Sequence, residues 1–341
     1  MSSEYIKSLF NARSLFSTYV AIPICILGIT SELFSVIVFL SLKTFRQNSC
    51  AFYLMSMSSF NFIRLLFGVS FNVMSMTFPI NWTSVLFFFC RLRTSLIGFS
   101  YLSAIICLCL AVIDQYFATC SRPYWQQWSN IKVAHRVTIT ITIICMLHAI
   151  SFLIFFNQLS SSNTATCISS NPTFLQYYVY GYFFTYGTVL PLIAVIFGIM
   201  SFRNARTLTT RTNPLIRREL DKQLTVMVLV EICVYVCTYI PFLISNAFSS
   251  LNTSYDPVFL AQLNLINAFT FTLFIVTHGV RSFYSMNIFN FSSPFFFRIH
   301  SSLMFVYRND FVVKQNMSCM IFISIDVDKI GLFQTMSKYK S

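Results

Sequence analysis

The residues with the clearest capacity for chemistry lie at the two ends of one long apolar segment in this 341-residue chain. Cys90 precedes the segment, and the triplet Asp114, Gln115 and Tyr116 ends it 24 residues later. In an α-helix that separation is about 36 Å, close to the roughly 30 Å hydrocarbon core of a bilayer. The spacing therefore predicts a thiol at one face of a membrane and a carboxylate at the other.

Four charged side chains lie inside other apolar segments: Glu32, Arg64, Glu231 and Arg281. A charge within a bilayer is costly and is usually paired, so such residues mark functional sites. Arg64 and Arg281 are both candidate partners for Glu231, and the sequence does not choose between them. A transporter or channel could use the four residues as an intramembrane pathway, although the chain has no internal repeat.

Enzyme chemistry has little support in the sequence. The HExxH, GxSxG and P-loop patterns are absent, and the 11 cysteines form neither CxxC pairs nor clusters with histidine. His148 and His278 stand singly in membrane segments without paired carboxylates, a pattern typical of hydrogen bonds between helices. We therefore expect no catalytic residue, no metal site and no cofactor.

The composition defines the broad class of protein. Hydrophobic residues make up 56% and charged residues only 10% of the chain, whereas globular proteins carry about 25% charged residues. The net charge of +13 comes from short basic runs between apolar segments, which argues against a nucleic-acid partner. The sequence is that of an integral protein of the lipid bilayer, and it shows no cleavable signal peptide.

Seven apolar segments are long enough to cross a bilayer as helices, which takes about 20 mainly apolar residues. The second contains several serines and Arg64, which leaves a six-helix arrangement as an alternative. The predicted spans are Ser17–Leu42, Cys50–Val73, Thr94–Ile113, Val137–Phe156, Leu175–Met200, Gln223–Phe248 and Val258–Tyr284.

The basic residues predict the orientation of these helices. The first, third and fifth connections carry Lys and Arg and the others carry none, which places the N-terminus outside and the C-terminus in the cytoplasm. The sequons at Asn81 and Asn252 fall on the outer side as potential glycosylation sites. Cys90 and Cys167 are the only cysteines placed at this oxidising face, where they form a disulfide or remain two unrelated thiols.

At this point the chain resembles the rhodopsin-like (class A) G-protein-coupled receptors over roughly residues 17–286. The resemblance rests on Cys90, on the triplet that ends the third segment, on Pro191 in the fifth segment and on the run Tyr235–Phe242 in the sixth. The chain is similar to divergent invertebrate members, many of them orphans. It departs from the family where Gln115 replaces an arginine and where the seventh segment lacks the Asn-Pro-x-x-Tyr motif.

The resemblance implies a switch at the inner face. In the family the acid of the triplet holds the neighbouring arginine, which in turn locks to an acid on the sixth helix. Gln115 can hydrogen-bond to Asp221 on that helix more weakly than a charged arginine would, so the resemblance predicts raised basal activity. The sixth helix would pivot at Pro241, with Tyr239 in the place of the family's tryptophan. The implied switch set is Asp114, Gln115, Tyr116, Asp221, Tyr239 and Pro241.

The resemblance also implies a Cys90–Cys167 disulfide and a ligand pocket in the outer half of helices three, five, six and seven. Retinal is excluded because the seventh segment has no lysine for a Schiff base. A monoamine ligand is disfavoured because Ile97 stands where amine receptors have an aspartate. Arg91 and Arg93 could attract an anionic ligand group or contact lipid headgroups. The implied pocket residues, which could equally pack the bundle, are Ile97, Tyr101, Phe183, Gly187, Tyr239, Phe242, Asn246 and Thr270.

Polar residues depart from the family at the centre of the bundle. Glu32, Asn61 and Arg281 fall where the family has its polar centre, and Asn61 replaces the aspartate that binds sodium in relatives. We expect Glu32 and Arg281 to form an ion pair between helices one and seven, with Asn61 as a hydrogen-bond neighbour. The alternative is that each charge reaches the interface or pairs elsewhere.

The sequence thus predicts an all-α, seven-helix membrane protein of the plasma membrane. It comprises an extracellular N-terminus (1–16), a receptor domain (17–286) and an atypical cytoplasmic tail (287–341), which could reflect an altered reading frame. The expected function is transduction of an extracellular ligand signal to a heterotrimeric G protein. A receptor-like protein that does not couple and a transporter or channel are the alternatives.

Overall fold

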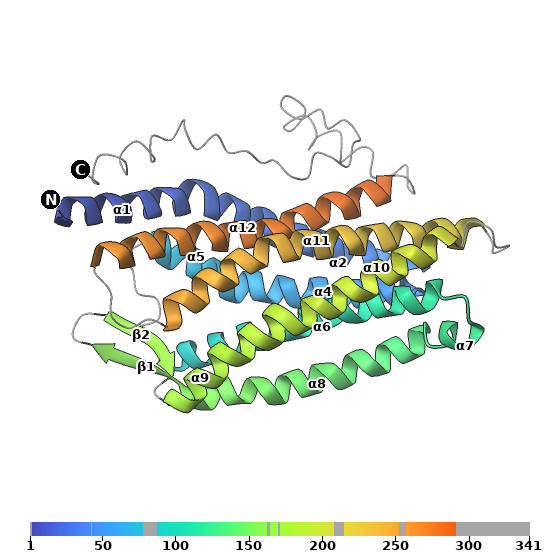
Figure 1. Ribbon diagram of the computed structural model, residues 1–341, viewed down its shortest axis with the longest axis horizontal. Coiled ribbons are helices and arrows are strands. Elements are labelled where there is room, and N and C mark those ends of the chain that lie inside the picture. Colours follow the sequence, from blue (N-terminus) through green and yellow to red (C-terminus); the bar gives the residue numbers. More distant parts are fainter. Residues whose placement is uncertain are drawn as a thin grey trace, which may run out of the picture. The chain divides into compact units, whose positions relative to one another are not determined.

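The computed structural model describes residues 2–41, 43–77, 87–161, 164–169, 171–207, 215–251 and 257–290. Within these ranges the chain is almost entirely helical, and the long helices lie side by side (Figure 1). Seven helices are long and apolar enough to cross a membrane, which confirms the seven-helix expectation over the six-helix alternative. The spans are Glu4–Ser41, Ser49–Met74, Cys90–Thr119, Ile131–Phe155, Gly187–Asn204, Leu224–Ser249 and Pro257–His278.

Three of the spanning helices consist of several consecutive elements, and each of the other four is one α-helix. The first consists of α1 (Ser2–Phe16), the π-helical turn η1 (Ser17–Ala21) and α2 (Ile22–Ser41). The second consists of α4 (Ser49–Arg64), η2 (Leu65–Val69) and α5 (Ser70–Thr77), and the fifth of α9 (Pro172–Gly181), η4 (Tyr182–Val189) and α10 (Leu190–Thr207). The remaining spans are α6 (Phe87–Thr119), α8 (Ile131–Phe155), α11 (Leu215–Leu251) and α12 (Pro257–Asn290), with short helices α3 (Lys43–Arg46) and α7 (Pro123–Gln126).

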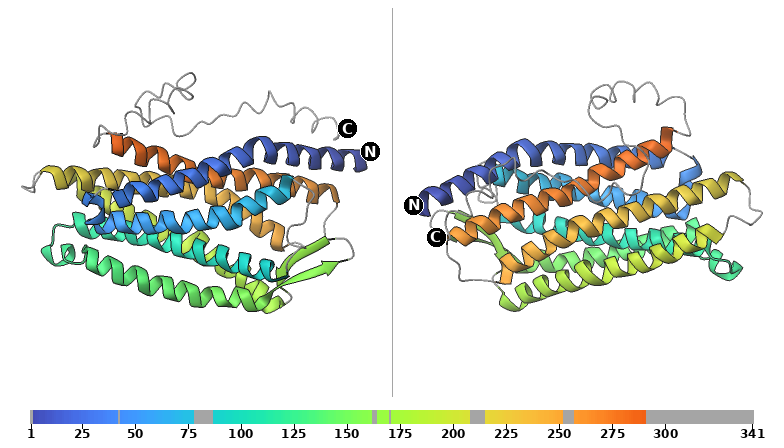
Figure 2. Two further views of the ribbon diagram at one scale, coloured as in Figure 1. Left: turned by 180° about the vertical axis from the view of Figure 1, so that it is seen from behind. Right: turned by 45° about the horizontal axis from the view of Figure 1, so that its top comes forward.

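The third span, α6, is the most buried of the seven: 67% of its apolar window is buried, against 22% for α8. It packs against α4, α8 and α10, and the two further views show it among these helices (Figure 2). Its residues therefore face protein on most sides, whereas much of α8 presents Ile and Leu side chains outward. Outward apolar residues are what a helix needs where it meets lipid.

The connection between α8 and α9 contains a β-hairpin that the sequence did not predict. Strand β1 (Phe156–Ser161) pairs antiparallel with β2 (Thr164–Ser169), in a register that sets Gln158 opposite Cys167. The hairpin reaches α6, because Arg91 Nε donates a hydrogen bond of 3.1 Å to the carbonyl of Phe156. The strands therefore lie against the same end of α6 as Cys90.

The N-terminal residues continue the first helix instead of forming a separate segment. Leu9 is buried, the rings of Phe16 and Phe269 lie 5.7 Å apart, and Gln262 donates to the Tyr5 hydroxyl at 3.4 Å. These contacts hold α1 along α12. The helix extends further than the sequence indicated, because partners on α12 compensate for the mixed polar composition of residues 1–16.

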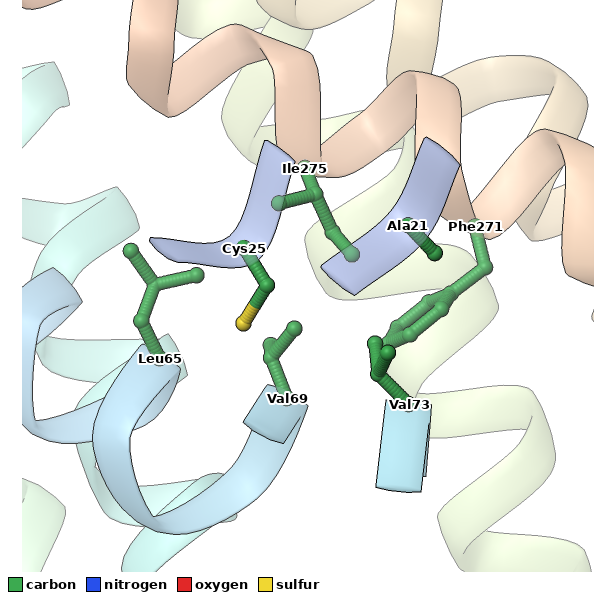
Figure 3. Close-up of a cluster of buried hydrophobic side chains, with 7 residues drawn as sticks. All are labelled: Ala21, Cys25, Leu65, Val69, Val73, Phe271 and Ile275. Carbon is green, nitrogen blue, oxygen red and sulfur yellow. The ribbon is translucent and has the colours of Figure 1, made fainter. Parts of the chain in front are cut away.

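Helices one, two and seven are held together by a cluster of small and branched side chains (Figure 3). Each member of the cluster is at most 8% exposed. Leu65 directly follows Arg64 and Ile275 lies about one turn before His278, so the cluster fixes the helix backbones that carry them. Its members are Ala21, Cys25, Leu65, Val69, Val73, Phe271 and Ile275.

Candidate functional site

Three ionisable side chains from three helices meet in the interior of the bundle, and we call Glu32, Arg64 and His278 the polar centre. Glu32 on α2 is fully buried, and its Oε1 lies 2.8 Å from Nδ1 of His278 on α12. Nε2 of the same ring contacts Nη2 of Arg64 at the end of α4. The imidazole therefore stands between a carboxylate and a guanidinium.

This geometry defines the protonation state of His278. A guanidinium has only hydrogen-bond donors, so Arg64 donates and Nε2 of His278 must accept. The ring proton then resides on Nδ1, which donates to Glu32. The neutral imidazole thus links Glu32 to Arg64 as a hydrogen-bonded bridge between opposite charges.

Aromatic rings surround the Arg64 guanidinium. Its carbon lies 5.2 Å from the ring centroid of Tyr101 and 4.9 Å from that of Phe274, within the range of cation–π attraction. The Tyr101 and Tyr235 hydroxyls are 2.8 Å apart, which joins α6 to α11 beside the arginine. Arg64 is only 5% exposed, so the rings replace part of the hydration that the charge lost.

A cavity of about 30 Å³ opens beside the polar centre. A water molecule needs about 10–15 Å³ and two or more polar partners, and this cavity provides both. Glu231 of α11 and Arg64 of α4 both line it. The full lining is Met57, Asn61, Arg64, Tyr101, Ala104, Ile105, Leu108, Glu231, Tyr235, Phe274, Thr277 and His278.

The structure revises one expectation for these residues and leaves another untested. His278 was expected to lack a carboxylate partner, which is wrong, because the fold brings in Glu32 from 246 positions earlier. The Glu32–Arg281 pair stays a prediction, since the Arg281 side chain lies outside the described part of the structure. Asn61 is buried and lines the cavity, as a neighbour of the polar centre would.

Part of the expected ligand set forms an aromatic cluster above the cavity. Tyr239 lies 5.8 Å from Tyr101 and 5.4 Å from Phe274, and Phe242 stacks on Phe274 at 5.5 Å. Thr270 is buried and bonds to the carbonyl of Ile266 in its own helix.

The other members of that set do not join this cluster. Ile97 fills the space beside Gly68, Asn246 is exposed, and Gly187 faces Leu243. The side chain of Phe183 lies outside the described part of the structure. The set as a whole therefore stays a prediction.

At the other end of α6 the acidic triplet contacts two helices. Ser49 of α4 donates to Asp114 Oδ2 at 2.7 Å and lies 3.1 Å from Ser129. Gln115 is 1% exposed, and its Oε1 accepts a 3.2 Å hydrogen bond from Thr225 of α11. These contacts hold α4 and α11 against α6 at neighbouring residues, Asp114 and Gln115.

Of two further members of the switch set, the structure describes the side chain of Tyr116 but not that of Asp221. The Tyr116 ring packs against Phe197 of α10 at 5.5 Å. The side chain of Asp221 is not among those described, so its bond to Gln115 stays a prediction. The contact with Thr225 was not anticipated, because a threonine within an apolar helix carries no distinctive sequence signal.

At the hairpin end, Cys90 is buried and disulfide-bonded. Cys167 lies on β2, and its pairing with Cys90 stays a prediction because its side chain is not described. Arg93 donates to the carbonyl of Gly68 at 3.3 Å and contacts Asn72 Oδ1. Its bonds are therefore made within the protein, between helices two and three. The sequons at Asn81 and Asn252 lie outside the described residues.

No group of three or more His, Cys, Asp or Glu side chains that could hold a metal occurs among the residues with described positions. The polar centre and the triplet are thus sites of charge and hydrogen-bond chemistry between helices. Such bonds between helices can be exchanged when the helices move.

Comparison with known families agrees with this architecture. Residues 33–280 match the family described as 7 transmembrane receptor (rhodopsin family). The chain belongs to this family, and it is accordingly a multi-pass receptor of the plasma membrane. Proteins of this family are receptors rather than enzymes.

Proposed function

We propose that this receptor converts the binding of an extracellular ligand into activation of a heterotrimeric G protein. The observation that carries the proposal is the contact between Gln115 of α6 and Thr225 of α11 at the level of Asp114. It is a neutral hydrogen bond at the inner end of the two helices whose separation would open an inner cleft. Ligand binding would shift the equilibrium toward the state in which this bond is broken.

The ligand would bind over the aromatic cluster of Tyr101, Tyr239 and Phe242. Small-molecule sites are mostly apolar, with a few polar groups that fix orientation, and the Tyr101–Tyr235 hydroxyl pair supplies such groups here. Retinal is excluded because residues 257–290 contain no lysine. A monoamine is disfavoured by Ile97 in the third helix.

The inner partner would bind where basic residues gather. Arg203, Arg206, Arg211, Arg217, Arg218 and Lys222 flank the connection between α10 and α11. Positive charge in a connection favours the cytoplasmic side. A cleft opened by α11 at this level would expose Asp114 and Gln115 to the G protein.

The test is agonist-independent G-protein activation by the full chain at matched surface expression. Thr225→Val removes the bond to Gln115, which is worth about 1 kcal/mol, so basal activation should rise about fivefold. Gln115→Arg and Asp114→Ala should also change the basal signal. Thr142→Val is the matched control, because Thr142 bonds only to the carbonyl of Thr138 in its own helix.

Two outcomes decide the proposal. A basal signal that rises in Thr225→Val and not in Thr142→Val would support coupling through the inner contact. An unchanged signal in all four variants at normal surface levels would refute it and favour the non-coupling alternative, in which Gln115 has lost the charge that the family uses.

A further inference from the structure

The buried carboxylate of Glu32 in the polar centre needs a cation to balance its charge. The resemblance to rhodopsin-like receptors implies a sodium site in this region, held by an aspartate on helix two, and this chain has Asn61 at that position. A hard cation needs several carboxylate, carbonyl or water oxygens around it. Here the Arg64 guanidinium already contacts His278, which holds Glu32. A sodium ion in the same cavity would lie against a fixed positive charge, so the residues present do not fit it.

We propose that Arg64 is the resident cation of the polar centre and that the cavity holds water instead of a metal ion. Arg64 reaches Glu32 through the neutral imidazole of His278 and lines the same cavity as Glu231. Arg64, on α4, provides the positive charge for the carboxylates of Glu32 on α2 and of Glu231 on α11. The proposal goes beyond coupling and does not depend on it.

The burial of Glu32 explains why a cation such as Arg64 is needed beside it. Isolated charges cannot be removed from water without a partner or strong hydrogen bonds, and Glu32 is fully buried. Its carboxylate therefore requires positive charge nearby in the folded state. The rings of Tyr101 and Phe274 lie within 5.2 Å and 4.9 Å of the guanidinium carbon and stabilise a cation at this point.

A tethered cation differs from a bound ion in one measurable respect. A bound ion stabilises a protein in proportion to its concentration, whereas a side chain is always present. The stability of this receptor should therefore not depend on sodium. Removing the Arg64 charge should leave the carboxylates and the cavity, and so create a sodium dependence that the natural chain lacks.

The experiment is thermal unfolding of the full chain in detergent, in sodium chloride and in choline chloride at equal ionic strength. A thiol-reactive fluorophore reports unfolding, because Cys50, Cys107 and Cys145 are not disulfide-bonded and are at most 1% exposed. The natural chain should give the same melting temperature in both salts. Arg64→Met, which keeps most of the side-chain length, should melt several degrees lower in choline and recover in sodium. Glu32→Gln combined with Arg64→Met should abolish that recovery.

The matched control is Arg93→Met. Arg93 is also partly buried over an aromatic ring, 5.8 Å from Phe71, and it donates to the carbonyl of Gly68 and the amide oxygen of Asn72. Its removal should lower the melting temperature equally in both salts. If Arg64→Met does not fold, Arg64→Lys serves instead, because it keeps the charge and should remain indifferent to sodium.

Three results would overturn the proposal. The first is a natural chain stabilised by sodium, with the effect lost in Glu32→Gln. The second is a folded Arg64→Met variant that melts at the same temperature in both salts. The third is an Arg64→Lys variant that gains a sodium dependence. Sodium dependence confined to Arg64→Met would support the proposal.

Discussion

Replacing His278 by alanine should destabilise the receptor more than any other single histidine substitution. The imidazole makes one contact to the Glu32 carboxylate and one to the Arg64 guanidinium. Hydrogen bonds to charged groups contribute about 1.5–3 kcal/mol each, and breaking a buried charge pair costs about 3–5 kcal/mol. At 2–4 °C per kcal/mol, the apparent melting temperature should fall by roughly 6–20 °C. The fluorescent thiol assay measures this directly.

Two amide variants separate the contacts of His278. In His278→Asn the side-chain amide can donate at the position of Nδ1 and keep Glu32, whereas in His278→Gln the amide oxygen can accept at the position of Nε2 and keep Arg64. Each should recover about half of the loss seen with alanine. His148→Ala is the control, because the 3.0 Å hydrogen bond between His148 and the Tyr177 hydroxyl lies at a more exposed position. A His278→Ala variant no less stable than His148→Ala would show that the bridge between the charges is not formed.

Three other perturbations test separate parts of the structure. Tyr101→Phe or Tyr235→Phe should each lower stability by about 1–2 kcal/mol by leaving the other hydroxyl without this bond, and the double variant should lose less than the sum, as a thermal double-mutant cycle would show. Gly187→Ala would set a Cβ against Leu243 Cδ2, the end of a flexible side chain, so surface expression should fall only modestly, and Leu243→Ala in the same chain should relieve that clash. Reduction with dithiothreitol should lower the melting temperature of the natural chain but not of Cys90→Ala, because Cys90 is disulfide-bonded.

The helices could be predicted from the sequence because lipid imposes a simple requirement. Each span needs about 20 apolar residues, and the seven runs that meet this requirement became the seven spans. The extension of the first helix to Ser2 could not be predicted, because it depends on contacts such as Phe16 with Phe269. Those contacts join residues far apart in the chain and leave no local periodic signal.

The contacts within the polar centre could not be predicted from the sequence. The sequence paired Glu32 with Arg281, whose side chain lies outside the described residues, and offered Arg64 as a partner for Glu231. Which residue of the seventh helix meets Glu32 depends on the rotation of α12, and one turn separates His278 from Arg281. A bond between residues 246 positions apart is set by that rotation and not by residue type. His278 therefore looked solitary in the sequence although the fold places it between two charges.

The length of the first helix has a mechanical consequence. Its apolar span covers 38 residues, which at 1.5 Å per residue is about 57 Å, nearly twice the hydrocarbon thickness of about 30 Å. Roughly half of the helix therefore extends beyond the acyl chains while α1 remains packed on α12. A force or torque applied to the N-terminal end would reach Glu32 on α2 through continuous hydrogen-bonded backbone, and would reach α12, which carries His278, through the packing of α1 against that helix.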